Sequence, residues 1–334
     1  MNVSSRLAAV GLVALAAVDV FLVGAALRST NASAFEASAA DARQLSVPGA
    51  STNVVENPAS ALSTPSTSST ASTPSPTSYT SRTTSPADGA TAVAAPLQIM
   101  LVATDSQHAW RVHAGTCADG GATLATTSDG GKTWVDAKTP LRSIVRVRPS
   151  DAKTAFVIGA GSNCVADLKS TTNSGGVWGS TSTVGSAWFR DPKDPRAVQA
   201  PGSATAKPCG GPDVLDLAVL SSTTARVLCA DGLVRETTDT GSSWADSGQV
   251  SGAVALAVLS ASPAQTYVAR LGAPDCAGVQ IERVDQSVGT SCIETELPKD
   301  PGQIALSLVR GGGWLAIGET TMLSTDDLAT WTVS

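Results

Sequence analysis

Charged and aromatic residues are scarce in this sequence. Charged residues make up 15% of the 334 positions, aromatic residues make up 4%, and the formal net charge is −6. Because no basic tract interleaved with aromatic residues occurs, the sequence argues against a nucleic-acid partner. The cysteines show no C-x-x-C spacing, and His108 and His113, five positions apart, would fall on opposite faces of a strand. We therefore expect no metal site and no cofactor.

One long apolar run is present, at the N-terminus. It extends over twenty-one residues from Leu7 to Leu27 and contains one charge, Asp19. A helix of that length spans roughly 30 Å, the thickness of a bilayer core, whereas the core of a cleaved signal is usually about 7–15 residues long. Ala32-Ser33-Ala34 has the form of a signal-peptidase site, so secretion after cleavage behind Ala34 is the alternative. We predict that residues 1–28 form an uncleaved single-pass transmembrane helix in the cell membrane, with the rest of the chain outside the cytoplasm.

The segment 29–95 has the composition of a linker. Between Ser60 and Ala87, eighteen of twenty-eight residues are Ser or Thr and four are Pro. Such a segment buries too little apolar surface to offset its chain entropy, so we expect it to be disordered. The same composition is typical of O-glycosylated stalks, although a plain spacer needs no modification.

All six cysteines lie in the remaining segment, 96–334, which is long enough for one domain. An even number of cysteines in an exported chain favours three disulfides, and six cysteines allow fifteen connectivities. Pairing between neighbours along the sequence is the simplest of these. It gives the pairs Cys117–Cys164, Cys209–Cys229 and Cys276–Cys292.

A short polar pattern occurs four times in this segment. It consists of Ser or Thr, any residue, Asp or Asn, and a Trp five positions after the Asp or Asn. A pattern that returns along the chain indicates a repeat architecture. The four copies contain Asp129 and Trp134, Asn173 and Trp178, Asp239 and Trp244, and Asp326 and Trp331.

Each copy follows two short runs of alternating apolar residues, which predict strands joined by tight turns. A unit without the polar pattern occupies residues 254–284, and a shortened unit lies near 188–198, where Pro192 stands 43 positions after Pro149. Repeats of about 40–45 residues with four strands each are typical of a β-propeller. We predict an all-β propeller of about six blades, with five or seven as alternatives. We expect its last blade to borrow a strand from residues 92–97.

At these residues the chain resembles the Asp-box, or BNR-repeat, propeller families, which include sialidases, sortilin-type receptors and photosystem II assembly factors. The run Gly313-Trp314-Leu315-Ala316-Ile317-Gly318 before Ser324-Thr325-Asp326 is most similar to the assembly-factor group. The resemblance implies that each box forms the hairpin between the third and fourth strands of a blade. It also implies that the box Asp accepts backbone hydrogen bonds and that the box Trp packs between blades. These eight residues are therefore expected to be structural, and the resemblance transfers no ligand.

The resemblance to sialidases raises the alternative of a glycoside hydrolase. Sialidases use an Arg triad, a Tyr–Glu pair and an Asp, but this chain has two tyrosines, Tyr79 in the linker and Tyr267 in an expected strand without a neighbouring Glu. The Arg-Ile-Pro signature is absent, and Phe189-Arg190-Asp191-Pro192 matches it only faintly. We therefore predict no catalytic residues and keep a secreted sialidase-like hydrolase as the alternative.

Three arginines form the candidate ligand site. Arg142, Arg146 and Arg148 are separated by even offsets, which place them on one side of a strand. If that strand is the innermost of its blade, the three side chains face the mouth of the central channel and form an anion-binding patch. A charged strand edge in contact with solvent is the alternative.

These features favour a binding or assembly module built from an anchor (1–28), a linker (29–95) and a propeller (96–334). A binding module needs only a shaped surface, whereas a hydrolase needs acids that converge on a pocket. We predict a membrane-tethered, monomeric, extracytoplasmic propeller that is not an enzyme. Its expected partner is an envelope protein or a cell-wall glycan.

Overall fold

The computed structural model describes residues 96–139, 141–180, 184–202, 204–260, 263–286 and 288–334. The predicted anchor, the predicted linker and the cleavage site behind Ala34 lie outside the described residues. Within the described residues, no helix is long and apolar enough to cross a membrane. Their regular structure is strand, apart from the short 3-10 turns η2 (Val184–Ser186) and η3 (Pro301–Gln303).

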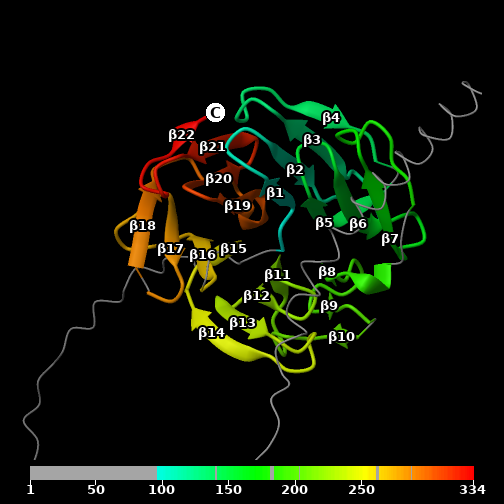
Figure 1. Ribbon diagram of the computed structural model, residues 1–334. Helices are drawn as coiled ribbons and strands as arrows, with labels where there is room; N and C mark the ends of the chain where they lie inside the picture. Colours follow the sequence, from blue (N-terminus) through cyan, green and yellow to red (C-terminus); the bar gives the residue numbers. More distant parts are fainter. Residues whose placement is uncertain (1–95, 140, 181–183, 203, 261–262, 287) are drawn as a thin grey trace, which may run out of the picture. The chain divides into compact units, whose positions relative to one another are not determined.

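Six antiparallel sheets surround a central axis as the blades of a propeller (Figure 1), which confirms the predicted all-β fold and blade number. Blade 1 has β1 (Ile99–Ala103), β2 (Ala109–His113), β3 (Thr123–Thr127) and β4 (Val135–Ala137). Blade 2 has β5 (Ser143–Pro149), β6 (Ala155–Ala160) and β7 (Ala166–Thr171), and blade 3 has β8 (Phe189–Arg190), β9 (Val198–Gln199) and β10 (Thr205–Ala206). Blade 4 has β11 (Val214–Val219), β12 (Ala225–Cys229), β13 (Leu233–Thr237) and β14 (Ala245–Gln249). Blade 5 has β15 (Ala253–Leu259), β16 (Gln265–Arg270), β17 (Val279–Arg283) and β18 (Val288–Ile293). Blade 6 has β19 (Ile304–Val309), β20 (Gly312–Ile317), β21 (Thr320–Ser324) and β22 (Thr332–Val333).

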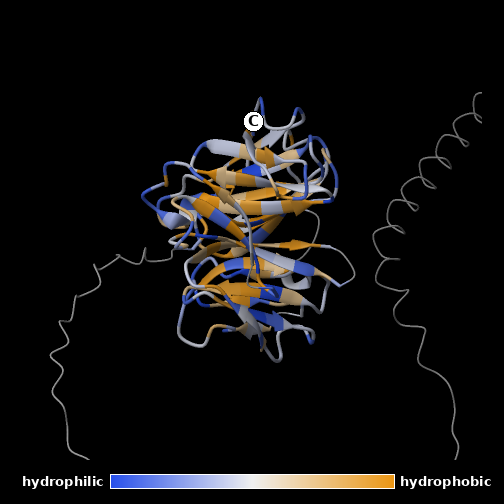
Figure 2. Ribbon diagram, turned by 90° about the vertical axis from the view of Figure 1, so that its left-hand side faces the viewer, coloured by the Kyte–Doolittle hydropathy of each residue, from blue (hydrophilic) through white to orange (hydrophobic). Residues whose placement is uncertain are grey.

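The alternating apolar runs of the sequence form the inner strands of the blades, and their side chains fill the space between neighbouring blades. One buried cluster joins Met100 of blade 1, Val147 of blade 2 and Leu306 of blade 6. Another joins Leu228 of blade 4 to Val268 of blade 5. Figure 2 shows the consequence, since the strands are largely hydrophobic and the loops at their ends largely hydrophilic. Burial between blades therefore stabilises the ring, as expected for a repeat fold.

Blades 2 and 3 are smaller than the other four. Blade 3 consists of strands of two residues each, with Phe189 paired to Gln199 in the first ladder, which confirms the shortened unit. Blade 2 has three strands among the described residues, and beyond β7 an isolated bridge pairs Ser170 with Gly179.

The prediction that the last blade borrows a strand from residues 92–97 finds no support at the described residues 96 and 97, which form no strand. Blade 6 takes its outermost strand, β22, from the C-terminal end of the chain, where Val333 pairs with Met322. The part of the expected segment before residue 96 lies outside the described residues. Leu97 donates its backbone N–H to the carbonyl oxygen of Leu215 in blade 4 (3.3 Å), not to blade 6.

Side chains of blades 1 and 6 close the ring. The indole rings of Trp134 and Trp314 meet edge to face with their centroids 6.5 Å apart. Trp314 Nε1 donates to the carbonyl oxygen of Asp105 (2.9 Å), and the Ala103 amide donates to Ser307 Oγ (3.0 Å). The C-terminus lies at this boundary between blades 6 and 1 (Figure 1). Packing and hydrogen bonds that involve side chains therefore join blades 6 and 1.

The antiparallel order of the strands gives the ring two different ends. In every blade the first and third strands end at one side of the ring, and the second strand ends at the other. The first side carries the turns with Asp or Asn and is called the turn face below. The second side carries the loops between second and third strands and is called the disulfide face.

Three disulfides lie at the disulfide face and confirm the predicted pairs. They are Cys117–Cys164 between blades 1 and 2, Cys209–Cys229 between the segment after blade 3 and blade 4, and Cys276–Cys292 within blade 5. No cysteine is free in the described part of the chain. Disulfides form in oxidising compartments, so the three bonds indicate an extracytoplasmic environment for the propeller.

Candidate functional site

Turns that follow the third strands share one hydrogen-bond pattern at the turn face. In blade 1, the Thr133 amide donates to Asp129 Oδ1 (3.0 Å), the Thr133 hydroxyl to Asp129 Oδ2 (2.6 Å) and the Thr127 hydroxyl to Asp129 Oδ1 (2.8 Å). Asp239 in blade 4 and Asp326 in blade 6 accept the corresponding bonds. The hydroxyl bond, followed by the amide bond, lowers the pKa of each of these three carboxyl groups to about 2. Each carboxylate therefore holds its own turn.

Blade 2 carries Asn173 in place of Asp, and a second position changes with it. The Val177 amide donates to Asn173 Oδ1 (2.9 Å), and Val177 has no side-chain donor. The other three turns have Thr133, Ser243 and Thr330 at that position. A side-chain amide nitrogen cannot accept a hydrogen bond, so a hydroxyl at this position in blade 2 could not make the donor bond that it makes to the carboxylate in the other three turns. Asp with a hydroxyl and Asn with Val are thus matched pairs.

The residue after each Asp or Asn fastens the turn to the loop between the first two strands of the same blade. All four of these residues have positive φ, between 56° and 77°. Their amides donate to a carbonyl oxygen of that loop, in the pairs Gly130 to Gln107, Ser174 to Lys153, Thr240 to Thr223 and Asp327 to Gly311. The repetition of this bond makes the turn face a regular scaffold.

The Trp of each pattern packs toward the preceding blade. In blade 1 this is the indole contact that closes the ring. In blade 4, Trp244 meets Trp188 at the start of blade 3, with the ring centroids 6.1 Å apart. In blade 6, Trp331 Nε1 donates to Ser291 Oγ of β18 (3.0 Å), and in blade 2 Trp178 packs against the buried cluster shared with blade 1.

A cavity of about 300 Å³ opens at the turn face on the propeller axis. All six innermost strands, β1, β5, β8, β11, β15 and β19, contribute to its lining. The uncharged side chains of the described lining are aliphatic apart from Ser260 and Ser307, and none of them is aromatic. Four charged side chains complete it: Arg146, Arg148, Arg190 and Asp216.

A second cavity of about 200 Å³ opens at the disulfide face between blades 1, 2 and 3. Leu97, Val145 and Arg190 line both cavities, so they form the wall between them. The second cavity also contains Ser143, whose buried hydroxyl has no hydrogen-bond partner among the described residues.

Arg190 and Asp216 cross-link the floor of the turn-face cavity. Arg190 Nη1 donates to Leu215 O (2.8 Å) and Nη2 to Leu97 O (3.5 Å), while Asp216 Oδ2 accepts the Leu256 amide (2.8 Å). An innermost strand has one unpaired edge, and its buried backbone groups need such partners. Burial lowers the pKa of Arg190 and raises that of Asp216, and the opposite charge of each group counteracts the shift of the other. Both charges are committed to the scaffold.

Two of the three predicted arginines lie at the turn-face cavity. Arg146 Nη1 donates to the carbonyl oxygen of Trp188, and its guanidinium lies 5.3 Å from the centroid of the Phe156 ring. Burial, together with the charge of Arg148, lowers the pKa of Arg146 to about 9, so Arg146 is still protonated at neutral pH. Arg148 is exposed at the mouth, and its side chain has no hydrogen bond or ion pair among the described residues.

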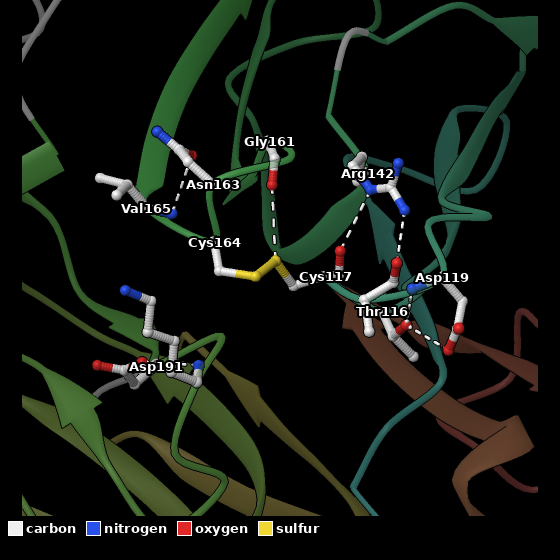
Figure 3. Close-up of a disulfide and its surroundings, with 11 residues drawn as sticks. Thr116, Cys117, Asp119, Arg142, Gly161, Asn163, Cys164, Val165 and Asp191 are labelled. Atoms are coloured by element: carbon white, nitrogen blue, oxygen red, sulfur yellow. Dashed lines mark hydrogen bonds between the residues drawn. A yellow bond between two sulfur atoms is a disulfide. The ribbon is translucent and has the colours of Figure 1, made fainter.

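Arg142 lies elsewhere, at the disulfide face (Figure 3), which corrects the prediction that the three arginines share one side of a strand. It precedes β5, and a bulge between Ile144 and Arg146 interrupts the alternation on which that prediction depends. Arg142 Nε donates to Cys117 O (3.2 Å), and Arg142 Nη2 donates to Ala118 O (2.6 Å). Arg142 therefore fixes the loop that carries one half of a disulfide.

Sequence reasoning missed Arg190 and Asp216 as residues of the axial cavity. A signal for Asp216 exists, because it is a lone charge within the apolar run 214–219. In the sequence, Arg190 stands out only as part of the faint match Phe189-Arg190-Asp191-Pro192, and its two-residue strand in the shortened blade gives no pattern that points to the axis.

The chain matches no family model, and no curated protein matches it in sequence. Solved structures with a similar fold include the SapL1 lectin in complex with alpha methyl fucoside, at 13% identity and a TM-score of 0.46, covering 72% of this chain and 96% of that chain. YCF48 bound to D1 peptide has 16% identity and a TM-score of 0.25, with 72% and 68% covered. The Trypanosoma rangeli sialidase in complex with the inhibitor DANA has 10% identity and a TM-score of 0.38, with 72% and 54% covered. These values are too low to transfer a ligand or a reaction to this chain.

Proposed function

We propose that the protein is a non-enzymatic binding module, tethered outside the cytoplasm by residues 1–28, and that its ligand enters the turn-face cavity. The observation that carries this proposal is an open axial cavity with an unpaired guanidinium, that of Arg148, at its mouth. The other charges of the lining are held by backbone groups. An unpaired guanidinium beside an apolar cavity attracts an anionic group.

The ligand belongs to an envelope component, either a protein or a cell-wall glycan, and the propeller acts as a monomer. A sugar ring presents an apolar face that stacks well on aromatic side chains. The described lining has no aromatic side chain, which supports a protein ahead of a glycan.

Two observations support a module without catalytic activity over a sialidase-like hydrolase. Asp216 is the one carboxylate in the described lining, and its two oxygens accept the amides of Leu217 and Leu256, whereas ordinary glycoside hydrolysis uses a pair of carboxyl groups. Tyr267 is 9% exposed and its hydroxyl donates to Gln265 Oε1 (3.1 Å). We expect no release of product from a sialoside or an aryl glycoside by the purified chain, and turnover would contradict the proposal.

Photo-crosslinking in intact cells tests the binding site. A benzoylphenylalanine residue replaces Ser260, which is exposed at the mouth of the cavity, or Ser162, which is exposed on the disulfide face. We expect a discrete cross-linked species from position 260 that Arg148→Gln weakens, and none from position 162. Cross-linking from position 162 alone, or cross-linking from position 260 that Arg148→Gln does not weaken, would contradict the turn-face cavity as the binding site.

A further inference from the structure

The walls of the turn-face cavity carry several aliphatic side chains. Val102, Leu217, Val219, Val258 and Leu308 all line it and all remain half-buried, not fully buried. Val102 and Leu308 also pack against one buried cluster between blades, and Leu217 and Val219 against another, so part of each side chain is already covered. Exposed aliphatic surface costs about 25 cal/mol per Å², and a concave site collects it where one occupant can cover several side chains at once. The walls therefore favour an aliphatic occupant.

Charge is distributed along the depth of the same cavity. At the floor, Arg190 and Asp216 carry opposite charges and are both bonded to backbone groups. On the wall, Arg146 is bonded to Trp188 O. At the mouth, Arg148 is exposed and unpaired among the described residues. At the floor the charges of Arg190 and Asp216 cancel and both side chains are already hydrogen-bonded. At the entrance, the positive charge of Arg148 is available to a ligand.

Size limits the occupant further. The cavity holds about 300 Å³, and Leu97, Val145 and Arg190 separate it from the cavity of the disulfide face. That volume lies at the lower end of the range of about 300–1,000 Å³ for small-molecule sites. It suits one unbranched chain and not a lipid with several chains.

We propose that the turn-face cavity binds an amphiphilic monoanion, a single aliphatic chain with one carboxylate, with the chain on the axis and the carboxylate at Arg148. This proposal rests on the proposed function in one respect, that the turn-face cavity is the ligand site. The head group pairs with the Arg148 guanidinium through charge-assisted hydrogen bonds. The chain covers the half-buried wall residues and ends above Leu97.

Photoaffinity labelling of the full chain tests the ligand class. One probe is dodecanoate with a diazirine near the end of its chain, and the matched probe is dodecylammonium with the same diazirine. Mass spectrometry of the digested protein locates the adducts, which separates the cavity from the apolar N-terminal segment. We expect dodecanoate to label β1, β11 and β15, and dodecylammonium to label them at least about tenfold less, the ratio that one lost charge-assisted bond produces.

Two variants sharpen the result. Arg148→Gln should reduce dodecanoate labelling of the inner strands by about tenfold or more. Arg310→Gln is the control, because Arg310 is exposed on the same face, in the turn between β19 and β20, and is not part of the lining. Equal labelling by the two probes, adducts confined to residues outside the cavity, or an equal loss in both variants would overturn the proposal.

The outcomes separate this proposal from the proposed function. Capture of an envelope component from position 260 that depends on Arg148, with no labelling of the cavity by dodecanoate, would retain the binding site and reject the aliphatic carboxylate. Labelling by dodecanoate without any cellular cross-link would retain the ligand class and reject an envelope protein or glycan as the partner.

Discussion

The two faces of this propeller are fastened in different ways. On the turn face, blades 1, 2, 4 and 6 repeat one turn, in which an Asp or Asn side chain and one backbone amide hold the loops together. On the disulfide face the loops differ from blade to blade, and the three disulfides join different kinds of neighbours. Short regular turns keep the rim in place without crossing the axis, which leaves the larger cavity open there. On the disulfide face, covalent bonds hold several of the irregular loops.

Among the changes that test this difference between the two faces, removal of the disulfide between blades 1 and 2 should reduce stability the most. A variant with Cys117→Ser and Cys164→Ser opens a loop of 47 residues, and the chain-entropy model gives a loss of about 4 kcal/mol in the free energy of unfolding. Urea denaturation of the full chain measures it. We expect dodecanoate labelling of the turn-face cavity to persist in the folded variant.

The disulfide within blade 5 provides the control. Its residues are separated by 16 positions, so Cys276→Ser with Cys292→Ser should lose about 3 kcal/mol and leave blades 1 and 2 unchanged. A loss below about 1 kcal/mol for the Cys117–Cys164 pair would mean that packing, together with Arg142, already fixes the disulfide face.

A second comparison separates the floor of the turn-face cavity from its mouth. Arg190→Met leaves the carbonyl oxygen of Leu97 without the Arg190 donor and leaves that of Leu215 with the Leu97 amide alone. It also leaves the buried Asp216 without its opposite charge, so we expect a loss of about 3 kcal/mol in the free energy of unfolding. Arg148→Gln replaces an exposed side chain and should change the free energy of unfolding by less than about 0.5 kcal/mol. Similar urea midpoints for the two variants would contradict the assignment of Arg190 to the scaffold.

The sequence predicted the blades because each blade repeats a local signal. Alternating apolar runs mark the inner strands, and even the unit without the polar pattern, residues 254–284, has the spacing of its neighbours. The disulfides were predictable for a related reason, since each pair joins cysteines that are neighbours along the sequence.

Features that depend on contacts between distant segments were not predictable in this way. The closure of the ring involves Trp134 and Trp314, which are 180 positions apart, and strand composition alone does not decide which terminus completes a blade. Arg142 was assigned to the arginine patch wrongly because it precedes β5 and one bulge in that strand breaks the period of two, an irregularity that composition does not reveal. Asp216 bonds a backbone amide of the next blade, which only the assembled ring brings near.

The turns with Asp should respond to acid, whereas the turn with Asn173 should not. The pKa of Asp129, Asp239 and Asp326 is about 2 in the folded chain, below the ordinary value of 3.8. Their contribution to stability is therefore complete above about pH 4 and is lost as the pH falls through 2. Asn173 does not titrate. In NMR spectra recorded from pH 5 to pH 1.5, the Ser243 amide should shift with a midpoint near 2, whereas the Val177 amide should not.

A double-mutant cycle tests the matched pairs at the same turn. Asp239→Asn alone turns a side-chain amide toward the Ser243 hydroxyl, and Ser243→Val alone removes a donor from Asp239 Oδ2. The double variant reproduces the pair found in blade 2. We expect each single variant to lower Tm and the double variant to recover part of the loss. Additive losses would show that Asn173 and Val177 are not matched.

The smallest expected effect is a gain at Thr240, the residue after the Asp of blade 4. Its φ is 60°, a left-handed value that β-branched residues rarely adopt, whereas blade 1 has Gly130 at this position. Asn tolerates this conformation and keeps the backbone N–H that donates to Thr223 O (3.0 Å). Thr240→Asn should therefore raise the free energy of unfolding by about 0.5–1 kcal/mol, seen as a higher Tm. Thr238→Asn is the control, because Thr238 is exposed and its φ is not positive. A gain equal to that of the control would place the origin of the effect in the unfolded chain and not in the turn.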